Sequence, residues 1–119
     1  FFTTIIDLGF YDNYMDNDVL RRSCYFAIGL FIKACPKYGE EARPLLRKGL
    51  QDTDPVCAGL AAWALGMLPP DLNDQPMLRQ LAESGLDGSC LVTDGDMVVV
   101  CTPAELARDT LAGKPKLTI

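Results

Sequence analysis

Thiols and carboxylates are the side chains with which this chain could do chemistry, because its sequence contains no histidine. General acid–base catalysis would therefore depend on carboxylates, cysteine, lysine or tyrosine. The cysteines lie far apart and form no Cys-x-x-Cys motif, so neither a zinc site nor a closed set of disulfides is expected. Most are predicted to be buried free thiols in a reducing compartment. They are Cys24, Cys35, Cys57, Cys90 and Cys101.

Two cysteine features leave a redox role open. Cys35-Pro36 resembles the Cys-Pro step of loops that bind iron–sulfur clusters, although no other cysteine follows at short spacing. Cys90 and Cys101 are expected to lie near each other across a predicted hairpin. The alternative function is therefore an accessory or regulatory domain of a redox or iron–sulfur enzyme.

The acidic residues are explained by local structure. Turn chemistry accounts for Asp94 and Asp96, and loop or capping roles account for Asp71 and Asp74. A second acidic group could bind a hard cation, but it lacks the glycine and terminal glutamate of a calcium loop, so its members are predicted to be solvated. This group is Asp7, Asp12, Asp16 and Asp18. No catalytic, cofactor or metal site is predicted.

The charge distribution argues against nucleic-acid binding. The net charge is −5, and seven of the eleven basic residues lie between Arg21 and Lys48. Binding to DNA or RNA usually needs a dense positive surface, which an acidic chain does not offer. We interpret the basic group as a solvated helix face, with a patch for an acidic partner as the alternative. The longest apolar stretches are too short to span a bilayer and no signal sequence opens the chain, so a cytoplasmic location is expected.

Helical periodicity dominates the first two thirds of the chain. It predicts a short helix within residues 1–16 and a second from Asn17 or Asp18 to Cys35, where Pro36 ends it. Further helices are expected over residues 41–50, 55–68 and 74–85, each with a proline near its start.

An internal repeat relates these helices. The segment "NDVLRRSCYFAIGL" (17–30) aligns with "DPVCAGLAAWALGM" (54–67) at an offset of 37, which matches Phe26 with Trp63 and Gly29 with Gly66. The following helices, "RPLLRKGL" and "QPMLRQLA", match at an offset of 32. Two helix pairs of this kind are expected to stack, because each pair covers the apolar face of the other. Trp63 is accordingly predicted to be a core residue.

The segment "DTDPVCAGLAAWALGML" resembles HEAT-like repeats of the short bacterial type, the group named for phycobilisome lyases and also found as a tail module of epoxyqueuosine reductases. The resemblance covers roughly residues 17–84. It implies a mainly α fold of helical pairs, an α-α superhelix, and a surface that holds other proteins or attaches to a larger enzyme. The second unit has Cys57 and Ala58 where such repeats carry an arginine, whereas Arg21 or Arg22 fills that role in the first unit. A continuous ladder of Asp–Arg pairs between repeats is therefore not expected.

The C-terminal third departs from the repeat. Asp94-Gly95 predicts a tight turn between two strands, the second of which is "MVVVC", residues 97–101. This strand has no polar alternation, which predicts burial of both its faces. Thr102, Pro103 and Glu105 form a capping box for a final helix to about residue 112. The hairpin could cap the open end of the helical stack, or its edge could pair with a partner or a second copy.

We therefore expect one domain over residues 1–119, divided into an N-terminal helix (1–16), two HEAT-like repeats (17–88), a β-hairpin plus helix (89–113) and a tail (114–119). Its predicted function is that of a non-enzymatic protein-interaction or scaffold module without cofactors, nucleic acid or membrane partners. The protein partner is unidentified, and a homodimer through the hairpin is one form of it. The candidate binding residues are Arg43, Arg47, Lys48, Met97, Val98, Val99 and Val100.

Overall fold

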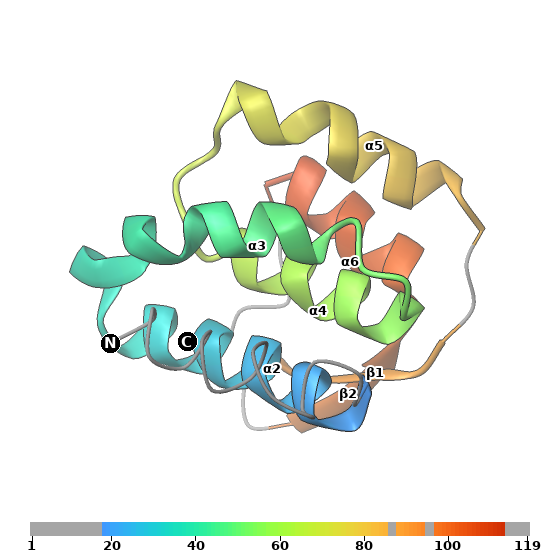
Figure 1. The fold of residues 1–119 in the computed structure, drawn as a ribbon, viewed down its shortest axis with the longest axis horizontal. Helices are drawn as coiled ribbons and strands as arrows, with labels where there is room; N and C mark the ends of the chain where they lie inside the picture. Colours follow the sequence, from blue (N-terminus) through green and yellow to red (C-terminus); the bar gives the residue numbers. More distant parts are fainter. Residues whose placement is uncertain (1–17, 86–87, 95–96, 114–119) are drawn as a thin grey trace.

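The fold is mainly helical with one small sheet (Figure 1). A computed structural model describes residues 18–85, 88–94 and 97–113. The helices are α2 (Asp18–Ala34), α3 (Arg43–Gly49), α4 (Pro55–Leu65), α5 (Gln75–Glu83) and α6 (Pro103–Leu111), and two 3-10 segments are η2 (Pro36–Ala42) and η3 (Leu72–Asp74). The strands β1 (Cys90–Asp94) and β2 (Met97–Cys101) form an antiparallel pair.

The predicted mainly α class with a C-terminal hairpin and helix is thus confirmed. The helix expected within residues 1–16, the turn at Gly95 and the tail from residue 114 lie outside the described residues. No helix in the described ranges is both long and apolar enough to cross a membrane.

The centre of the fold is α4, which contacts α2 on one side and α6 on another (Figure 1). All residues from Val56 to Leu65 are buried, because this helix carries no charged residue and is covered all round. It begins as predicted, with Pro55 in its first turn and the Asp54 carboxylate accepting a hydrogen bond from the amide of Cys57. The chain thus builds outward from α4, with α3 on α4 and α5 against α6.

Two glycines allow close packing against α4. A Cβ atom at Gly29 of α2 would overlap the ring of Trp63, with the nearest ring atom at 2.3 Å. Phe26 stacks on the same ring, with centroids 5.3 Å apart and planes 11° apart. On another side, Gly59 lets Pro103 at the start of α6 approach, since a Cβ there would lie 2.9 Å from the Pro103 Cα. The missing side chains thus admit an aromatic ring at Gly29 and a second backbone at Gly59.

The prediction for the third helix needs correction at its start. Residues 36–42 form the 3-10 segment η2, and α-helical geometry begins only at Arg43, with Pro44 in its first turn. Pro36 and Pro44 each lack an amide hydrogen, which limits the backbone hydrogen bonds available to this segment. The helix is consequently shorter than the predicted 41–50.

The strand β2 is not buried on both faces, so that prediction is wrong. In the pairing with β1, Leu91 lies opposite Val100, and Cys90 lies opposite Cys101. One face of the hairpin is buried on the helices, whereas Leu91 and Val100 remain exposed on the other. Side chains alternate across a strand, and a two-stranded sheet supported on one side has one open face. The predicted capping box of α6, by contrast, is present in full at Thr102 and Glu105.

Candidate functional site

A row of ion pairs joins α2 to the segment just before α4. Arg21 donates to both carboxylate oxygens of Asp52, at 3.0 and 2.9 Å, and also contacts Asp18 at 2.7 Å. The neighbouring Arg22 likewise donates to both carboxylate oxygens of Asp54, at 2.7 and 2.9 Å. Paired hydrogen bonds between a guanidinium and a carboxylate are among the stronger polar contacts in proteins. The cap of α4 is therefore fixed from two directions, by α2 and by its own first turn.

This arrangement predicts an acid-sensitive contribution to stability. The Arg22 guanidinium, helped by the Cys57 amide, lowers the pKa of Asp54 from 3.8 to about 2. Because the folded-state pKa is depressed, the stabilisation is complete above about pH 4 and is lost as the pH falls towards 2. Since the Arg22 side chain is 40% exposed, we expect this group to lower the free energy of unfolding by roughly 1–2 kcal/mol between pH 5 and pH 2.

Urea unfolding at the two pH values tests this expectation in the intact chain and in Asp54→Asn. The variant keeps a similar shape but has no carboxylate to titrate, so its dependence on pH should be shallower. Equal loss of stability in both proteins would show that other carboxylates carry the acid sensitivity.

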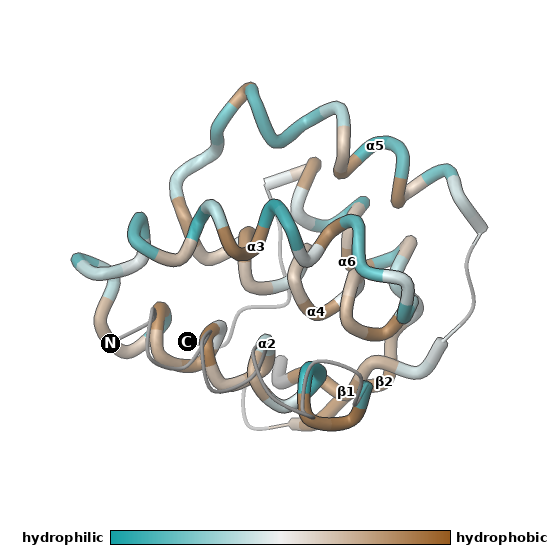
Figure 2. Tube along the Cα trace, viewed as in Figure 1, coloured by the Kyte–Doolittle hydropathy of each residue, from teal (hydrophilic) through white to brown (hydrophobic). Residues whose placement is uncertain are grey.

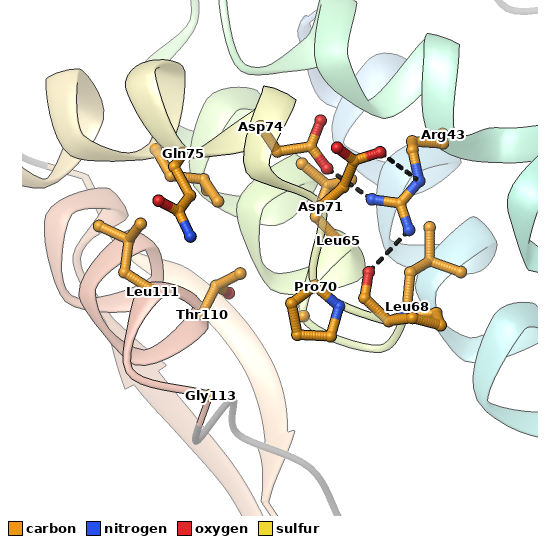
Figure 3. A pocket seen from close by; sticks show the side chains of 13 residues that line it. Arg43, Leu65, Leu68, Pro70, Asp71, Asp74, Gln75, Thr110, Leu111 and Gly113 are labelled. Carbon is orange, nitrogen blue, oxygen red and sulfur yellow. Dashed lines mark hydrogen bonds and ion pairs between the residues drawn. The ribbon is translucent and has the colours of Figure 1, made fainter.

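A second row of ion pairs joins α3 to the segment just before α5. Arg43 donates to Asp74 at 2.5 Å, to both oxygens of Glu40 at 2.8 Å and to the Pro69 carbonyl at 2.8 Å. Figure 3 shows its guanidinium turned towards Asp71 and Asp74. Arg43 is only 6% exposed, so its charge is used inside the fold.

Arg47, one turn further along α3, completes this row. It contacts Asp74 and also donates to Asp71 at 2.9 Å. Asp74 is buried between the two arginines and makes no side-chain capping bond to α5, so the predicted capping role of Asp74 is wrong. Asp71 does cap η3, by accepting from the Asn73 amide.

These two rows correct two expectations from the sequence. Arginines of α2 reach the acids before α4, and arginines of α3 reach the acids before α5, so an Arg–Asp ladder does connect the two helix pairs. Nor do these arginines form a solvated face, because Arg21 and Arg43 are buried. Of the three basic binding candidates, Arg43 is withdrawn from solvent, Arg47 is half-buried in the ladder and Lys48 is exposed.

A small cavity of about 200 Å³ lies beside the second row, between α4, α5 and α6 (Figure 3). Leu65, Leu78 and Leu111 contribute its apolar lining. The Thr110 hydroxyl donates to the Ala62 carbonyl at 2.8 Å, and Arg43 is held by its acids. Arg43, Asp74 and Thr110 beside this cavity therefore already have hydrogen-bond partners within the protein, and we assign the cavity a packing role.

The thiols are poorly placed for nucleophilic chemistry. Burial and the neighbouring Cys101 raise the pKa of Cys90 to about 12, and burial raises the pKa of Cys57 as well. A thiolate is the reactive form of cysteine, so both groups are protonated near neutral pH. All five cysteines are free thiols. In the described part of the chain, no three potential ligands among cysteine and the acids converge as a metal site would require.

The most unusual surface is a group of exposed apolar residues on the hairpin. Leu91, Met97, Val98 and Val100 are 57%, 68%, 66% and 63% exposed, and we call these four residues the hairpin patch. None carries a charge or a side-chain hydrogen-bonding group. Soluble proteins rarely leave neighbouring large apolar side chains uncovered, and such clusters mark interaction surfaces.

The hairpin patch continues into an apolar groove between the hairpin and α2. This groove has a volume of about 420 Å³ and is lined by Phe26 of α2, Val56 and Leu60 of α4, and Leu91 and Val98 of the hairpin. The start of α2 lies beside the hairpin (Figure 1), where Figure 2 shows hydrophobic residues on the strands and both hydrophilic and hydrophobic residues on the helix. Apolar side chains thus continue from the hairpin patch into the groove, whose lining also includes Arg22, Ser23 and Ser89.

The binding candidates predicted on the second strand lie in two different environments. Met97, Val98 and Val100 belong to the exposed patch, whereas Val99 packs against the core. Leu91 was missed as a candidate, although side chains alternate along a strand and its predicted partner strand already held the candidate Val100, which lies opposite Leu91. The basic candidates Arg43, Arg47 and Lys48 lie on α3 and are not among the residues of the patch or the groove.

Comparisons with known proteins gave no match, so we interpret this surface from its geometry. No protein-family model matches the chain, and neither a curated protein nor a solved structure matches it.

Proposed function

We propose that this chain is a non-enzymatic protein-interaction module whose helix pairs stack in the manner of short HEAT-like repeats. In this proposal α2 with α3 and α4 with α5 are successive units of a superhelix, and α6 with the hairpin closes its end. The module works in the cytoplasm, where free thiols persist.

Equivalent positions of the two units support the stacking. Phe26 and Trp63, which match at the offset of 37, are stacked on each other across the α2–α4 contact. The Arg–Asp ladder supports it as well, because each helix of the first unit reaches the acids that precede its counterpart in the second. Nearest-neighbour contacts of this kind are what hold repeat arrays together.

The observation that carries the interaction role is the uncovered hairpin patch. A pair of strands is marginal on its own, and this one rests on the helices by one face only. Three apolar residues of its other face, Leu91, Val98 and Val100, are exposed and are bordered by a groove of about 420 Å³. The hairpin patch and the apolar side chains of this groove suit contact with another protein surface better than binding of a charged or small polar ligand.

Site-specific photo-crosslinking tests this role in cells of the source organism. A photoreactive amino acid at position 98 should crosslink the chain to another protein molecule, and the additional change Val100→Lys should remove the product. The matched control is the same amino acid at position 72, since Leu72 is 78% exposed but lies on η3. Equal products from positions 98 and 72, or none from position 98, would rule out a specific interface at the patch.

A second candidate function is the accessory domain of a redox enzyme. The direct pairing of Cys90 with Cys101 across the hairpin favours it. Metal analysis of protein purified without oxygen distinguishes the two functions. Stoichiometric iron or zinc would support the redox role over a scaffold alone.

A further inference from the structure

We propose that the hairpin patch is the contact through which two copies of this chain form a symmetric dimer. This inference rests on the proposed interaction function and names the partner as a second copy. The two faces of the hairpin, their charge and the area available carry the argument.

The geometry of the hairpin puts three residues of the patch on one face, whereas Met97, which pairs with Asp94, falls on the other face by strand alternation. Leu91 faces Val100 across the two strands, and Val98 lies two residues from Val100 along the same strand. Residues in these positions point to the same face of a sheet. The opposite face carries Cys90, Val92 and Cys101, which are buried on the helices. The outer face is therefore available to pack against a second sheet. In sheets packed face to face the two layers lie about 10 Å apart.

The charge of the surface favours a copy of itself. The chain has a net charge of −5, so two copies brought together at random would repel each other. None of the four patch residues is charged, and the charged residue paired with Met97, Asp94, lies at the turn end of the hairpin. Arg22 at the edge of the groove already binds Asp54 through two hydrogen bonds and introduces no unpaired charge. An uncharged apolar face is complementary to the same face in another copy, which is what a twofold contact requires.

The size of the surface sets the strength of this dimer. Joining two patches with their adjoining grooves buries on the order of 1,000 Å² in total, which is near the lower limit of specific interfaces. We therefore expect a reversible dimer with a Kd of roughly 10 μM. Since the contact is apolar, raising the salt concentration should leave the dimer intact.

Sedimentation velocity of the full chain from about 1 to 100 μM tests the proposal. The intact chain and Leu72→Lys should shift from monomer to dimer over this range. Val98→Lys places a charge in the contact and should weaken the dimer at least roughly 30-fold. Val98 is two-thirds exposed, so the variant is expected to keep its circular dichroism and thermal midpoint, and Leu91→Thr serves as a second, uncharged variant. Val99 is unsuitable for this test because it packs against the core.

A chain that stays monomeric at the highest concentration would overturn the dimer, as would a dimer that survives in both Val98→Lys and Leu91→Thr. The crosslinked product from position 98 separates this failure from that of the interaction function. If the chain is monomeric and position 98 links to a different protein, the dimer falls and the interaction module stands. A link to residues 1–16 of the same chain would instead identify that segment as the cover and overturn the dimer.

Discussion

Replacing Asp74 with alanine is expected to lower the free energy of unfolding by about 3–5 kcal/mol. The Asp74 carboxylate is buried and lies between the guanidinium groups of Arg43 and Arg47. Its removal leaves the buried Arg43 with Glu40 and the Pro69 carbonyl at 2.8 Å and with Asp71 only at 4.0 Å. A buried charge that loses its partner is far more costly than a pair that never formed. Urea unfolding followed by circular dichroism measures the change.

Asp71→Ala is the matched control for this prediction. Asp71 belongs to the same row and contacts Arg47, but its side chain is 31% exposed, so its loss should cost about 1 kcal/mol or less. If the two variants were equally stable, solvent rather than Asp74 would be balancing the charge of Arg43. That result would also mean that the second row of ion pairs contributes little to holding α3 against the start of α5.

The second large effect is expected at Trp63. Its side chain is fully buried between Phe26 and the backbone at Gly29, so Trp63→Ala leaves a cavity at the contact of α2 with α4. Truncation of a buried aromatic residue to alanine typically costs about 3–5 kcal/mol, because the lost contacts are not replaced. Thermal and urea unfolding should both show this loss.

Tyr38→Ala provides the comparison for Trp63. Tyr38 is an aromatic residue that also contacts a phenylalanine, Phe31, but it lies on the surface at 43% exposure. Its truncation should change stability by less than about 1 kcal/mol. A similar loss in Trp63→Ala would mean that the helices close around the missing ring.

The sequence was most informative where residue identity constrains the backbone locally. Pro55 after Asp54 marks the start of α4, and the Thr102–Glu105 capping box marks the start of α6, because both depend on neighbours in the sequence. The match of Phe26 with Trp63 likewise anticipated a packing contact, since stacked repeats bring equivalent positions together.

The acids that pair with the arginines could not be predicted from the sequence in the same way. Arg21 and Asp52 are separated by 31 residues, and Arg43 and Asp74 by the same number. Which acid an arginine meets depends on how the helix pairs are rotated against each other, and the periodicity of one helix does not contain that information. The solvated face predicted for these residues followed from treating each helix alone.

The hairpin shows a different limit. In "MVVVC" every side chain is apolar, so the pattern does not indicate which residues face the core. The helices beneath β1 determine which face is buried: they cover Val92 and leave Leu91 exposed. The patch became visible only when the register of the two strands was known.

The position of α6 has a consequence for synthesis of the chain. Gly59 and Ala62 of α4 are covered by α6, whose first residue follows the hairpin and lies 44 residues after Gly59 in the sequence. During translation α2, α3 and α4 emerge first, and this side of the central helix stays uncovered until residue 111 has left the ribosome. A growing or prematurely terminated chain therefore displays a wholly apolar helix face that chaperones and proteases recognise. Docking of α6 is therefore the step that completes the burial of α4.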